Sequence, residues 1–367
     1  MKYKYLGNII ETSGKFHTSH MELSKKGCKV MFSMFKYINR LDQVPIHVYK
    51  KLFESLIKPI LMYNSEIWYM DFYEKILNAY KRANLQNKNC DILSLIDTSF
   101  IEKVNLKFCK FVLGLSKQSV NMAARSELAQ YPLEVNVKVQ TIKFLSRILS
   151  SKTNPLLYDA YCLTKSLHGK GTYTWYTFVD NIAKTNDIDF NEIKLDNFDK
   201  EKEKFSQKIK LQIQENFEKS FFEKLQCKTE SSKLFLYSKI KKTYSINPFL
   251  LTSNFESRKI LCKMRISDHF LEIEKGRYKN VKREERICHH CNLNEIDDEK
   301  HLFLNCTKNI THRENLIKNI NDIYPNIGLK NDEEKIQLFL SCPDILQFVV
   351  PFIEKSWSLR KVDSIAA

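Results

Sequence analysis

The sequence predicts a mostly α-helical protein. Hydrophobic residues recur at steps of three and four along several long segments, which is the spacing of one buried face of a helix. Only 8 glycines and 8 prolines occur in 367 residues, too few for the many turns of an all-β fold. The aromatic content of 12% argues against a disordered chain. At about 150 residues per domain, the length allows two or three domains.

The net charge indicates a polyanionic partner. Lysine and arginine number 59 against 43 aspartates and glutamates, a formal charge of +16, which favours nucleic acid ahead of an acidic membrane surface. No apolar run approaches the roughly 18 residues of a membrane-spanning helix, and the N-terminal residues lead into no hydrophobic signal core. We therefore expect an intracellular protein without a membrane partner. Its ten cysteines are then reduced thiols or metal ligands.

The first element is predicted to be one short strand. Residues 3–10 alternate loosely between polar and apolar side chains and stop at Ser13 and Gly14. A lone strand is not stable without a partner. The strand is therefore expected to pair with a segment much later in the chain, or with a sheet that this chain does not contain.

Two helices follow. Ser19 and Glu22 have the spacing of a capping box, so a helix is expected over residues 19–40. Pro45 suits the first turn of the next helix, and Pro59 falls inside its apolar pattern. A proline at such a position should kink the helix or end its first half.

Further helices are predicted beyond residue 100. Residues 101–115 carry one apolar face and a row of lysines on another, and a second helix is expected over residues 135–149. The segment 186–242 is dense in lysine and glutamate but keeps apolar residues at helical spacing, which favours a long solvated helix over a dedicated binding face. Between residues 71 and 99 the pattern weakens, which indicates a loop or an insertion.

One group of residues has the spacing of a zinc site. Cys288 and Cys291 are separated by two residues, His301 follows after nine more, and Cys306 follows after another four. Two thiolates from one tight turn, with a histidine and a cysteine about one helical turn apart, can complete a tetrahedron around Zn²⁺. Thiolate and imidazole ligands suit zinc and disfavour calcium or magnesium.

A closed set of four ligands leaves no open position, so the predicted zinc is structural rather than catalytic. Unrelated thiols are the alternative interpretation. Three further histidines are alternative nitrogen ligands: His289, His290 and His312.

A basic segment, residues 275–286, lies just before this cluster. Six of its twelve residues are basic, and Tyr278 can stack on a base, which suits a surface for RNA or single-stranded DNA. A solvated charged loop is the alternative. Upstream, Arg258 and Arg265 are seven residues apart and so share one helical face. The candidate nucleic-acid-binding residues are Arg258, Arg265, Lys275, Arg277, Tyr278, Lys282, Arg283 and Arg286.

No catalytic residue is predicted. Asp297 and Asp298 follow an apolar residue, as the Mg²⁺-binding carboxylates of polymerases do, but they lie between predicted zinc ligands. The chain carries no Walker-type loop, no Gly-x-Ser-x-Gly elbow and no Cys–His nucleophile setting. No small-molecule substrate is therefore expected.

In order, six strings resemble the C-terminal part of non-LTR (LINE-type) retrotransposon reverse transcriptases. Asn64 stands where that family usually has glycine in its Tyr-Gly-x-Glu-x-Trp motif. The strings are Tyr5-Leu6-Gly7, Leu56 to Trp68, Ile101 to Leu115 with Ser126-Glu127-Leu128 and Tyr131-Pro132-Leu133, Ser232 to Tyr237, Met264 to Tyr278, and Cys288, Cys291, His301 and Cys306 on the family's Cys-Cys-His-Cys zinc ligands.

The resemblance implies a function and an organisation. A tail of this kind grips template RNA and target DNA during target-primed reverse transcription, and the family acts on chromosomal DNA, which implies a nuclear location. The implied regions are a remnant palm strand (1–14), a helical thumb-like region (15–135), a helical linker region (136–250), the basic segment with the zinc knuckle (251–310) and C-terminal helices (311–367).

The chain departs from the family in one important way. The family's Mg²⁺-binding aspartates lie upstream of the Tyr-Leu-Gly strand, and here Met1 stands four residues before Tyr5. We therefore expect a truncated product that is inactive alone in primer extension. Two alternatives are part of an active RNA-directed DNA polymerase whose catalytic half is encoded just upstream, and a retained zinc-dependent protein-interaction module.

Overall fold

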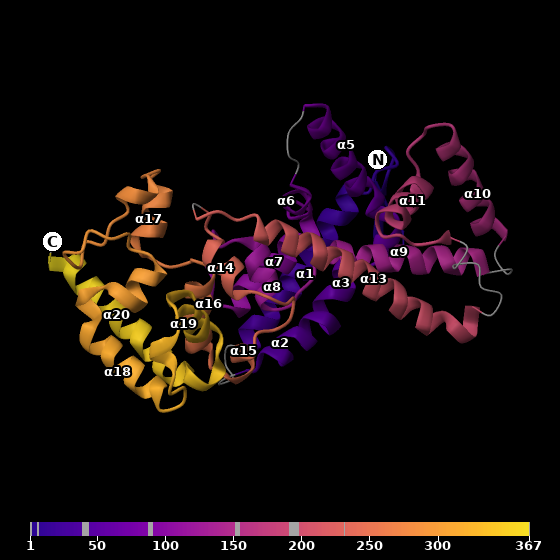
Figure 1. Cartoon of the computed structure of the whole chain (residues 1–367). Helices are drawn as coiled ribbons and strands as arrows, with labels where there is room; N and C mark the ends of the chain where they lie inside the picture. The colour runs from indigo at the N-terminus through magenta and orange to yellow at the C-terminus, as the bar shows by residue number, and fades with distance from the viewer. Residues whose placement is uncertain are drawn as a thin grey trace. The chain divides into compact units, whose positions relative to one another are not determined.

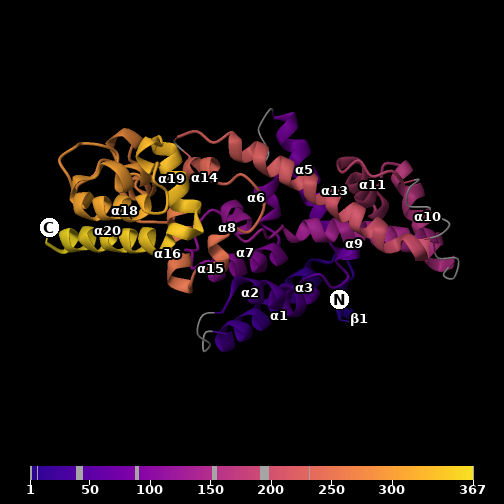
Figure 2. The same ribbon diagram turned by 60° about the horizontal axis from the view of Figure 1, so that its bottom comes forward.

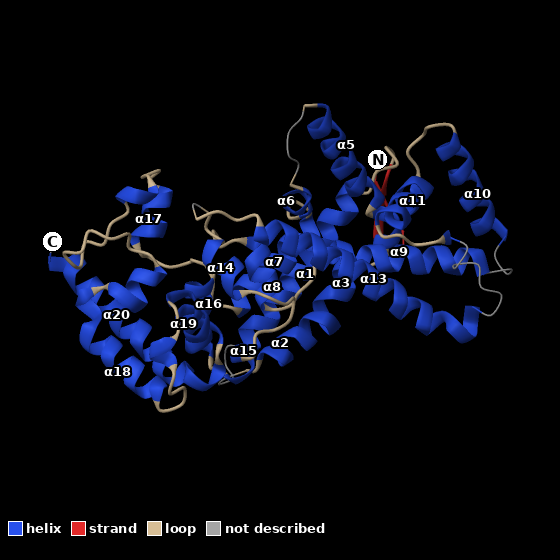
Figure 3. Ribbon diagram, viewed as in Figure 1, coloured by secondary structure: helices blue, strands red, loops and turns tan. Residues whose placement is uncertain are grey.

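The computed structural model describes residues 2–5, 7–38, 44–86, 91–150, 155–190, 198–230 and 232–366. These residues are mostly helical, with one small sheet at the N-terminus, as the sequence predicts (Figure 1, Figure 3). The chain divides into two compact units. Unit 1 comprises residues 1–41, 50–108 and 131–222, and unit 2 comprises residues 42–49, 109–130 and 223–367.

The N-terminal sheet is a hairpin, so the prediction of a single strand with a distant partner was wrong. Strand β1 (Lys2–Tyr5) pairs antiparallel with β2 (Asn8–Glu11), and Tyr5 lies opposite Asn8. Gly7 in the turn has φ +90, a conformation that glycine adopts without steric cost. The alternating pattern therefore continued through a tight turn that the sequence did not reveal. Leu6 lies outside the described residues.

The hairpin is anchored to helix α1 (His17–Ile38). The Glu11 carboxylate accepts a hydrogen bond of 2.8 Å from the Thr18 amide, and the Ser19 hydroxyl donates to Asn8 Oδ1 at 3.1 Å. Ser19 therefore lies inside the first turn and does not form the predicted capping box. The helix begins at His17, two residues before the predicted start, because Glu11 of the hairpin accepts the hydrogen bond of the Thr18 amide. The predicted end near Arg40 lies outside the described residues.

The proline expected to disrupt the next helix lies beside a π-helical turn. Helix α2 (Ile46–Leu52) is followed by a π-helix (Phe53–Ile57) and by α3 (Lys58–Leu61), which contains Pro59. A proline cannot donate to the carbonyl four residues before it, and a widened turn accommodates this loss.

The remaining helices of unit 1 confirm most of the predicted segments and correct one. The weak pattern over residues 71–99 is not a loop throughout: it contains α5 (Met70–Leu85) and α6 (Ile92–Ile96), while residues 87–90 lie outside the described chain. Helix α5 buries Tyr73 and Ile76. These two residues lie three apart on one face, so the helical spacing was present in this segment. The other helices are α4 (Ser65–Trp68), α7 (Phe100–Val112), α9 (Leu133–Ser150), α10 (Pro155–Gly169), α11 (Trp175–Thr185) and α13 (Phe198–Gln226).

Helix α13 confirms a long helix with one buried stripe inside the predicted segment 186–242, but the helix ends at Gln226 and does not reach residue 242. Its 29 residues are mostly charged or polar, and Phe205, Ile209, Ile213 and Phe221 are buried.

Unit 2 contains the predicted zinc ligands and is mostly helical. Helices α18 and α20 lie side by side in both views (Figure 1, Figure 2). The α-helices are α8 (Asn121–Glu127), α14 (Phe235–Ile240), α15 (Phe249–Thr252), α16 (Phe255–Arg265), α17 (Glu272–Tyr278), α18 (Ile310–Asn321), α19 (Asp332–Ser341) and α20 (Leu346–Ala366). Short 3-10 turns cover Arg283–Glu285, Thr307–Asn309, Ile327–Leu329 and Pro343–Ile345, and a π-helix covers His301–Asn305.

Unit 1 buries an imidazole in an aromatic cluster. His20 is 5% exposed, its ring centroid lies 4.6 Å from that of Trp68 and 5.3 Å from that of Phe100, and its Nε2 accepts from the Ile101 amide at 3.4 Å. Burial lowers the pKa of His20 to about 3, and nearby positive charges on His17, Lys75 and Lys103 add to the effect.

The buried His20 should make the stability of unit 1 fall in acid. The unfolded state binds a proton on this residue below a pH of about 6.5, whereas the folded state stays neutral down to a pH of about 3. Between these values the unfolding free energy should fall by up to about 1.4 kcal/mol per pH unit from this group. Denaturant titrations of wild type and His20→Phe between pH 7 and 4 measure the difference in slope.

The exposed His47, on helix α2, provides the control. His47→Asn should keep the wild-type slope. Equal pH slopes for wild type and His20→Phe would show that His20 does not resist protonation.

Candidate metal centre

The first two predicted ligands come from a short hairpin. Ile287 and Ile296 form an antiparallel bridge, and the Cys288 amide donates to the Glu295 carbonyl at 2.9 Å. Asn294 closes the turn with φ 52, in the left-handed region that asparagine tolerates better than most residues. The hairpin thus places Cys288 and Cys291 on one tight loop.

The other two ligands flank a π-helical turn. In the π-helix His301–Asn305, the Cys306 amide donates to the His301 carbonyl at 2.8 Å, a bond that spans five residues. A π turn is wider than an α turn and closes residue i+5 on residue i. The widened turn therefore brings His301 and Cys306 to the same place despite their spacing of five.

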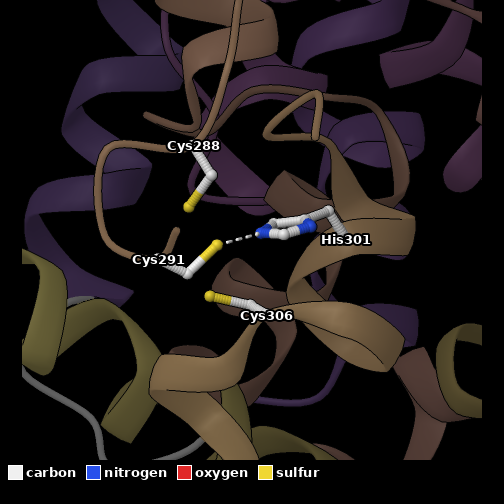
Figure 4. Close-up of side chains that lie close together, drawn as sticks. All are labelled: Cys288, Cys291, His301 and Cys306. Atoms are coloured by element: carbon white, nitrogen blue, oxygen red, sulfur yellow. Dashed lines mark hydrogen bonds between the residues drawn. The ribbon is translucent and has the colours of Figure 1, made fainter. Parts of the chain in front are cut away.

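All four side chains converge. The ligand atoms of Cys288, Cys291, His301 and Cys306, here called the CCHC cluster, lie within 4.8 Å of one another, and Cys291 Sγ is 3.4 Å from His301 Nε2 (Figure 4). Sulfurs bound to one tetrahedral zinc ion lie about 3.8 Å apart, given Zn–S bonds of about 2.3 Å. The cluster can therefore hold a metal ion with little movement. Within the described residues it is the one group of its kind found.

Glu295 orients the histidine of the cluster. Its Oε2 lies 2.9 Å from His301 Nδ1 and accepts a second hydrogen bond, of 2.8 Å, from Nδ2 of the Asn305 side chain. A carboxylate on one ring nitrogen leaves the other nitrogen free for a metal and makes it more basic. His301 Nε2 is thus the metal-facing atom. The alternative ligands His289, His290 and His312 are not in the group.

A buried arginine from the C-terminal helix reaches the cluster. Arg360 Nη1 lies 2.5 Å from Asp297 Oδ1, and its Nη2 lies 3.7 Å from Cys306 Sγ and 4.0 Å from Cys288 Sγ. Asp297 also accepts from the Glu272 amide, at the start of α17, at 3.0 Å. These contacts tie the hairpin, α17 and α20 together.

The cluster stabilises thiolate and imidazolium even in the absence of a metal. A hydrogen bond from Cys288 lowers the pKa of the Cys306 thiol, and the same bond raises the pKa of Cys288. Burial alone would lower the pKa of His301, but its hydrogen bonds to Cys306 and Glu295 raise it to about 9. A metal must therefore displace protons from Cys288 and His301, and its affinity falls as the pH falls.

The paired aspartates have structural roles. Asp297 is buried against Arg360, and Asp298 Oδ1 accepts from the His301 amide at 2.9 Å while its Oδ2 lies 3.6 Å from Arg283. Both carboxylates are thus used inside the module.

Two of the predicted nucleic-acid-binding residues are core residues, so their prediction was wrong. Arg265 is 0% exposed and forms a two-pronged ion pair with Glu127, and Arg258 is 2% exposed with its guanidinium over the rings of Tyr49 and Phe255. A guanidinium without accessible surface cannot reach a phosphate. Their shared helical face is the buried face of α16.

A third predicted residue, Arg286, holds the basic segment together. Its guanidinium donates to the carbonyls of Val281 and Ile273 at distances between 2.7 and 3.0 Å. A Cβ at Gly276 would come within 2.5 Å of the Arg286 side chain, so this packing requires glycine. Arg286 therefore shapes the segment and is not a free cation.

The other five predicted residues keep accessible surface. Tyr278 is 62% exposed, and Lys275 and Lys282 are exposed. Arg277 and Arg283 are half-buried and pair with Glu274 and Asp298. These five belong to one stretch that ends just before Cys288, so the exposed part of the basic segment adjoins the CCHC cluster in the chain.

Three residues of the metal centre were not predicted from the sequence. Glu295, Asp297 and Arg360 support the ligands, and Arg360 lies 54 residues beyond Cys306. In the sequence, the only sign of a role for Glu295 is that a carboxylate lies six residues before His301, which is a weak signal. No spacing in the sequence points to Arg360.

None of the family models, curated proteins or solved structures compared with the chain matches it. Among the described helices, none is by itself long and apolar enough to cross a membrane. One pair, Asp332–Ser341 with Pro343–Arg360, passes on combined length and composition but is bent by 81°.

Proposed function

We propose that the chain is a nucleic-acid-binding protein: the C-terminal part of a non-LTR (LINE-type) reverse transcriptase, gripping template RNA and target DNA through a zinc knuckle and the basic segment beside it. Nucleotide transfer would depend on residues outside this chain. A nuclear location belongs to the same proposal, since the family acts on chromosomal DNA.

The observation that carries the proposal is the convergence of the CCHC cluster. Its four ligand atoms lie within 4.8 Å of one another, and they come from the positions that resemble the family's zinc ligands. Three thiolates and an imidazole favour zinc among the common divalent ions. Four protein ligands would close the coordination sphere, so the zinc would organise the module rather than catalyse a reaction.

A backbone angle in unit 1 also supports the resemblance. Asn64 has φ 53, in the left-handed region. The family usually has glycine at this position of its Tyr-Gly-x-Glu-x-Trp motif, and glycine is the residue that adopts such an angle most readily. The turn before α4 (Ser65–Trp68) therefore has the conformation that the family's glycine would favour.

The basic segment provides cations and one aromatic ring for a single strand. Lys275, Arg277, Lys282 and Arg283 can neutralise phosphates, and the exposed ring of Tyr278 can stack on a base. The Lys233 amine lies 5.6 Å from the centroid of the Tyr278 ring. The same amine lies 3.3 Å from the Glu274 carboxylate, so Lys233 helps to hold the Tyr278 ring in place.

Binding of single-stranded RNA should depend steeply on salt. At about −0.7 per neutralised phosphate of a single strand, four phosphates predict a log–log slope of about −3. Lys282→Ala should reduce the magnitude of the slope by about 0.7. Tyr278→Ala should weaken binding by about 1–3 kcal/mol at every salt concentration, with the slope unchanged. Fluorescence anisotropy with a labelled oligonucleotide measures both effects.

Lys318, an exposed lysine on α18 in the same unit, is the matched control. Lys318→Ala should leave affinity and slope unchanged. An affinity that is nearly independent of salt, or equal effects of Lys318→Ala and Lys282→Ala, would contradict phosphate binding by the basic segment.

A further inference from the structure

Arg360 is a buried cation with few partners of its own. It is 3% exposed, and its only carboxylate partner in the described structure is Asp297, at 2.5 Å. Its Nε is buried without a hydrogen-bond partner among the described residues. A buried guanidinium costs several kcal/mol unless nearby charges and hydrogen bonds compensate it.

Arg265, in the same unit, is a buried guanidinium whose charge and donors are fully compensated. Its Nε and Nη2 bind the Glu127 carboxylate, and its Nη1 donates to the Leu340 carbonyl and the Ser341 hydroxyl. Every guanidinium nitrogen of Arg265 therefore has an oxygen acceptor. Arg360 differs, because its Nη2 faces two sulfurs of the CCHC cluster at 3.7 and 4.0 Å.

Bound metal would supply the missing compensation. A divalent ion with three thiolates and a neutral imidazole carries a net charge of −1, so the coordinated sulfurs remain good acceptors for an N–H donor. The Asp297 carboxylate holds the guanidinium from the other side. The position of Arg360 thus suits a filled metal site better than an empty one.

We propose that Arg360 is a positioning residue of the metal centre: its guanidinium stabilises the thiolates of Cys288 and Cys306 when metal is bound, and in this way it couples metal binding to the docking of helix α20. This inference rests on the proposed zinc site. Arg360 lies far from the four ligands in the sequence, so the ligand spacing gives no sign of this contact.

Apolar contacts add to the hold on the first half of α20. The rings of Phe352 and Phe303 lie 5.4 Å apart, and Val349 and Ile353 are buried. The coupling should therefore act mainly on the second half of the helix, from Glu354 onwards. Metal removal should release this half before the first.

Zinc affinity of the full-length chain tests the inference. Loss of an outer-shell partner typically weakens metal binding 10- to 100-fold, so Arg360→Met should bind zinc at least tenfold more weakly in competition with a chromophoric chelator. Arg360→Lys keeps a charge but cannot span Asp297 and two sulfurs, and should fall between Arg360→Met and wild type. Lys355→Met, which removes an exposed lysine from the same helix, should bind as wild type does.

A spectroscopic readout separates this role from simple packing. In the Co²⁺-substituted chain, loss of an N–H donor to sulfur should shift the thiolate-to-cobalt charge-transfer band to longer wavelength in Arg360→Met, with no shift in Lys355→Met. Hydrogen exchange in residues 354–366 should rise when metal is removed from wild type.

Arg360→Met with a zinc affinity within twofold of wild type would overturn the inference while leaving the zinc site itself intact. If Arg360→Met does not fold, an equal affinity for Arg360→Lys and wild type would overturn it instead. A wild-type chain that binds no zinc would overturn both this inference and the zinc knuckle of the proposed function.

Discussion

Cys306→Ser should abolish stoichiometric metal binding and unfold the C-terminal module. Cys306 is 0% exposed, and its sulfur contacts Arg360 as well as the other ligands. Structural zinc contributes about 10–16 kcal/mol of apparent binding free energy in small zinc modules, as much as the whole unfolding free energy of a typical domain, about 5–15 kcal/mol. The purified wild-type chain should contain about one zinc per chain, and the variant less than half. Elemental analysis and thermal unfolding measure the two effects.

Cys227, an exposed thiol in the same unit, provides the control. Cys227→Ser should keep the metal and the thermal transition of wild type. Chelation of the wild-type chain should reproduce the Cys306→Ser phenotype. A wild-type chain with less than half an equivalent of zinc, unchanged by Cys306→Ser, would reject the zinc site.

Glu127→Gln should destabilise unit 2 by about 3–5 kcal/mol, because it leaves the Arg265 guanidinium buried without a counter-charge. Both side chains are 0% exposed, and three contacts of 2.9 to 3.2 Å join them. Burial alone would raise the pKa of Glu127, but Arg265 and Lys241 outweigh burial and lower it. The carboxylate is therefore ionised at neutral pH. Denaturant unfolding of each variant measures the loss.

The double variant Glu127→Leu/Arg265→Met tests the physical reason. Removal of both charges should cost less than either single change, since apolar residues of similar volume often replace a buried pair without loss. The exposed pair of Glu256 and Lys259, 3.1 Å apart on α16, gives the scale for a surface contact. Glu256→Gln should cost less than about 1 kcal/mol. A loss of that size for Glu127→Gln would contradict the assigned role.

The helices could be predicted where one face is wholly buried. Helices α7, α9 and α13 lie where the apolar spacing placed them, because burial of one face imposes a period near 3.6 on the sequence. Helix α5 was not predicted, although its buried residues Tyr73 and Ile76 lie three apart on one face, the spacing of a helix. The hairpin was not predicted, because a tight turn at Gly7 leaves little break in an alternating pattern.

The sequence by itself determined the mostly α-helical class and the four residues of the CCHC cluster, because both depend on residues close together in the chain. A helical period and a Cys-x2-Cys turn are local properties. The tertiary structure decided which cations are accessible. Arg265 lies beside Glu127, 138 residues away, and Arg360 reaches a cluster that ends 54 residues earlier.

Burial depends on which distant segments pack together, and no local pattern distinguishes an arginine that meets solvent from one that meets a carboxylate in the core. The positive charge of the whole sequence favours a polyanionic partner but does not say which cations would contact it. The fold reduces the candidate nucleic-acid contacts to Lys275, Arg277, Tyr278, Lys282 and Arg283. Folding removed Arg258 and Arg265 from this set and left Arg286 as a structural residue.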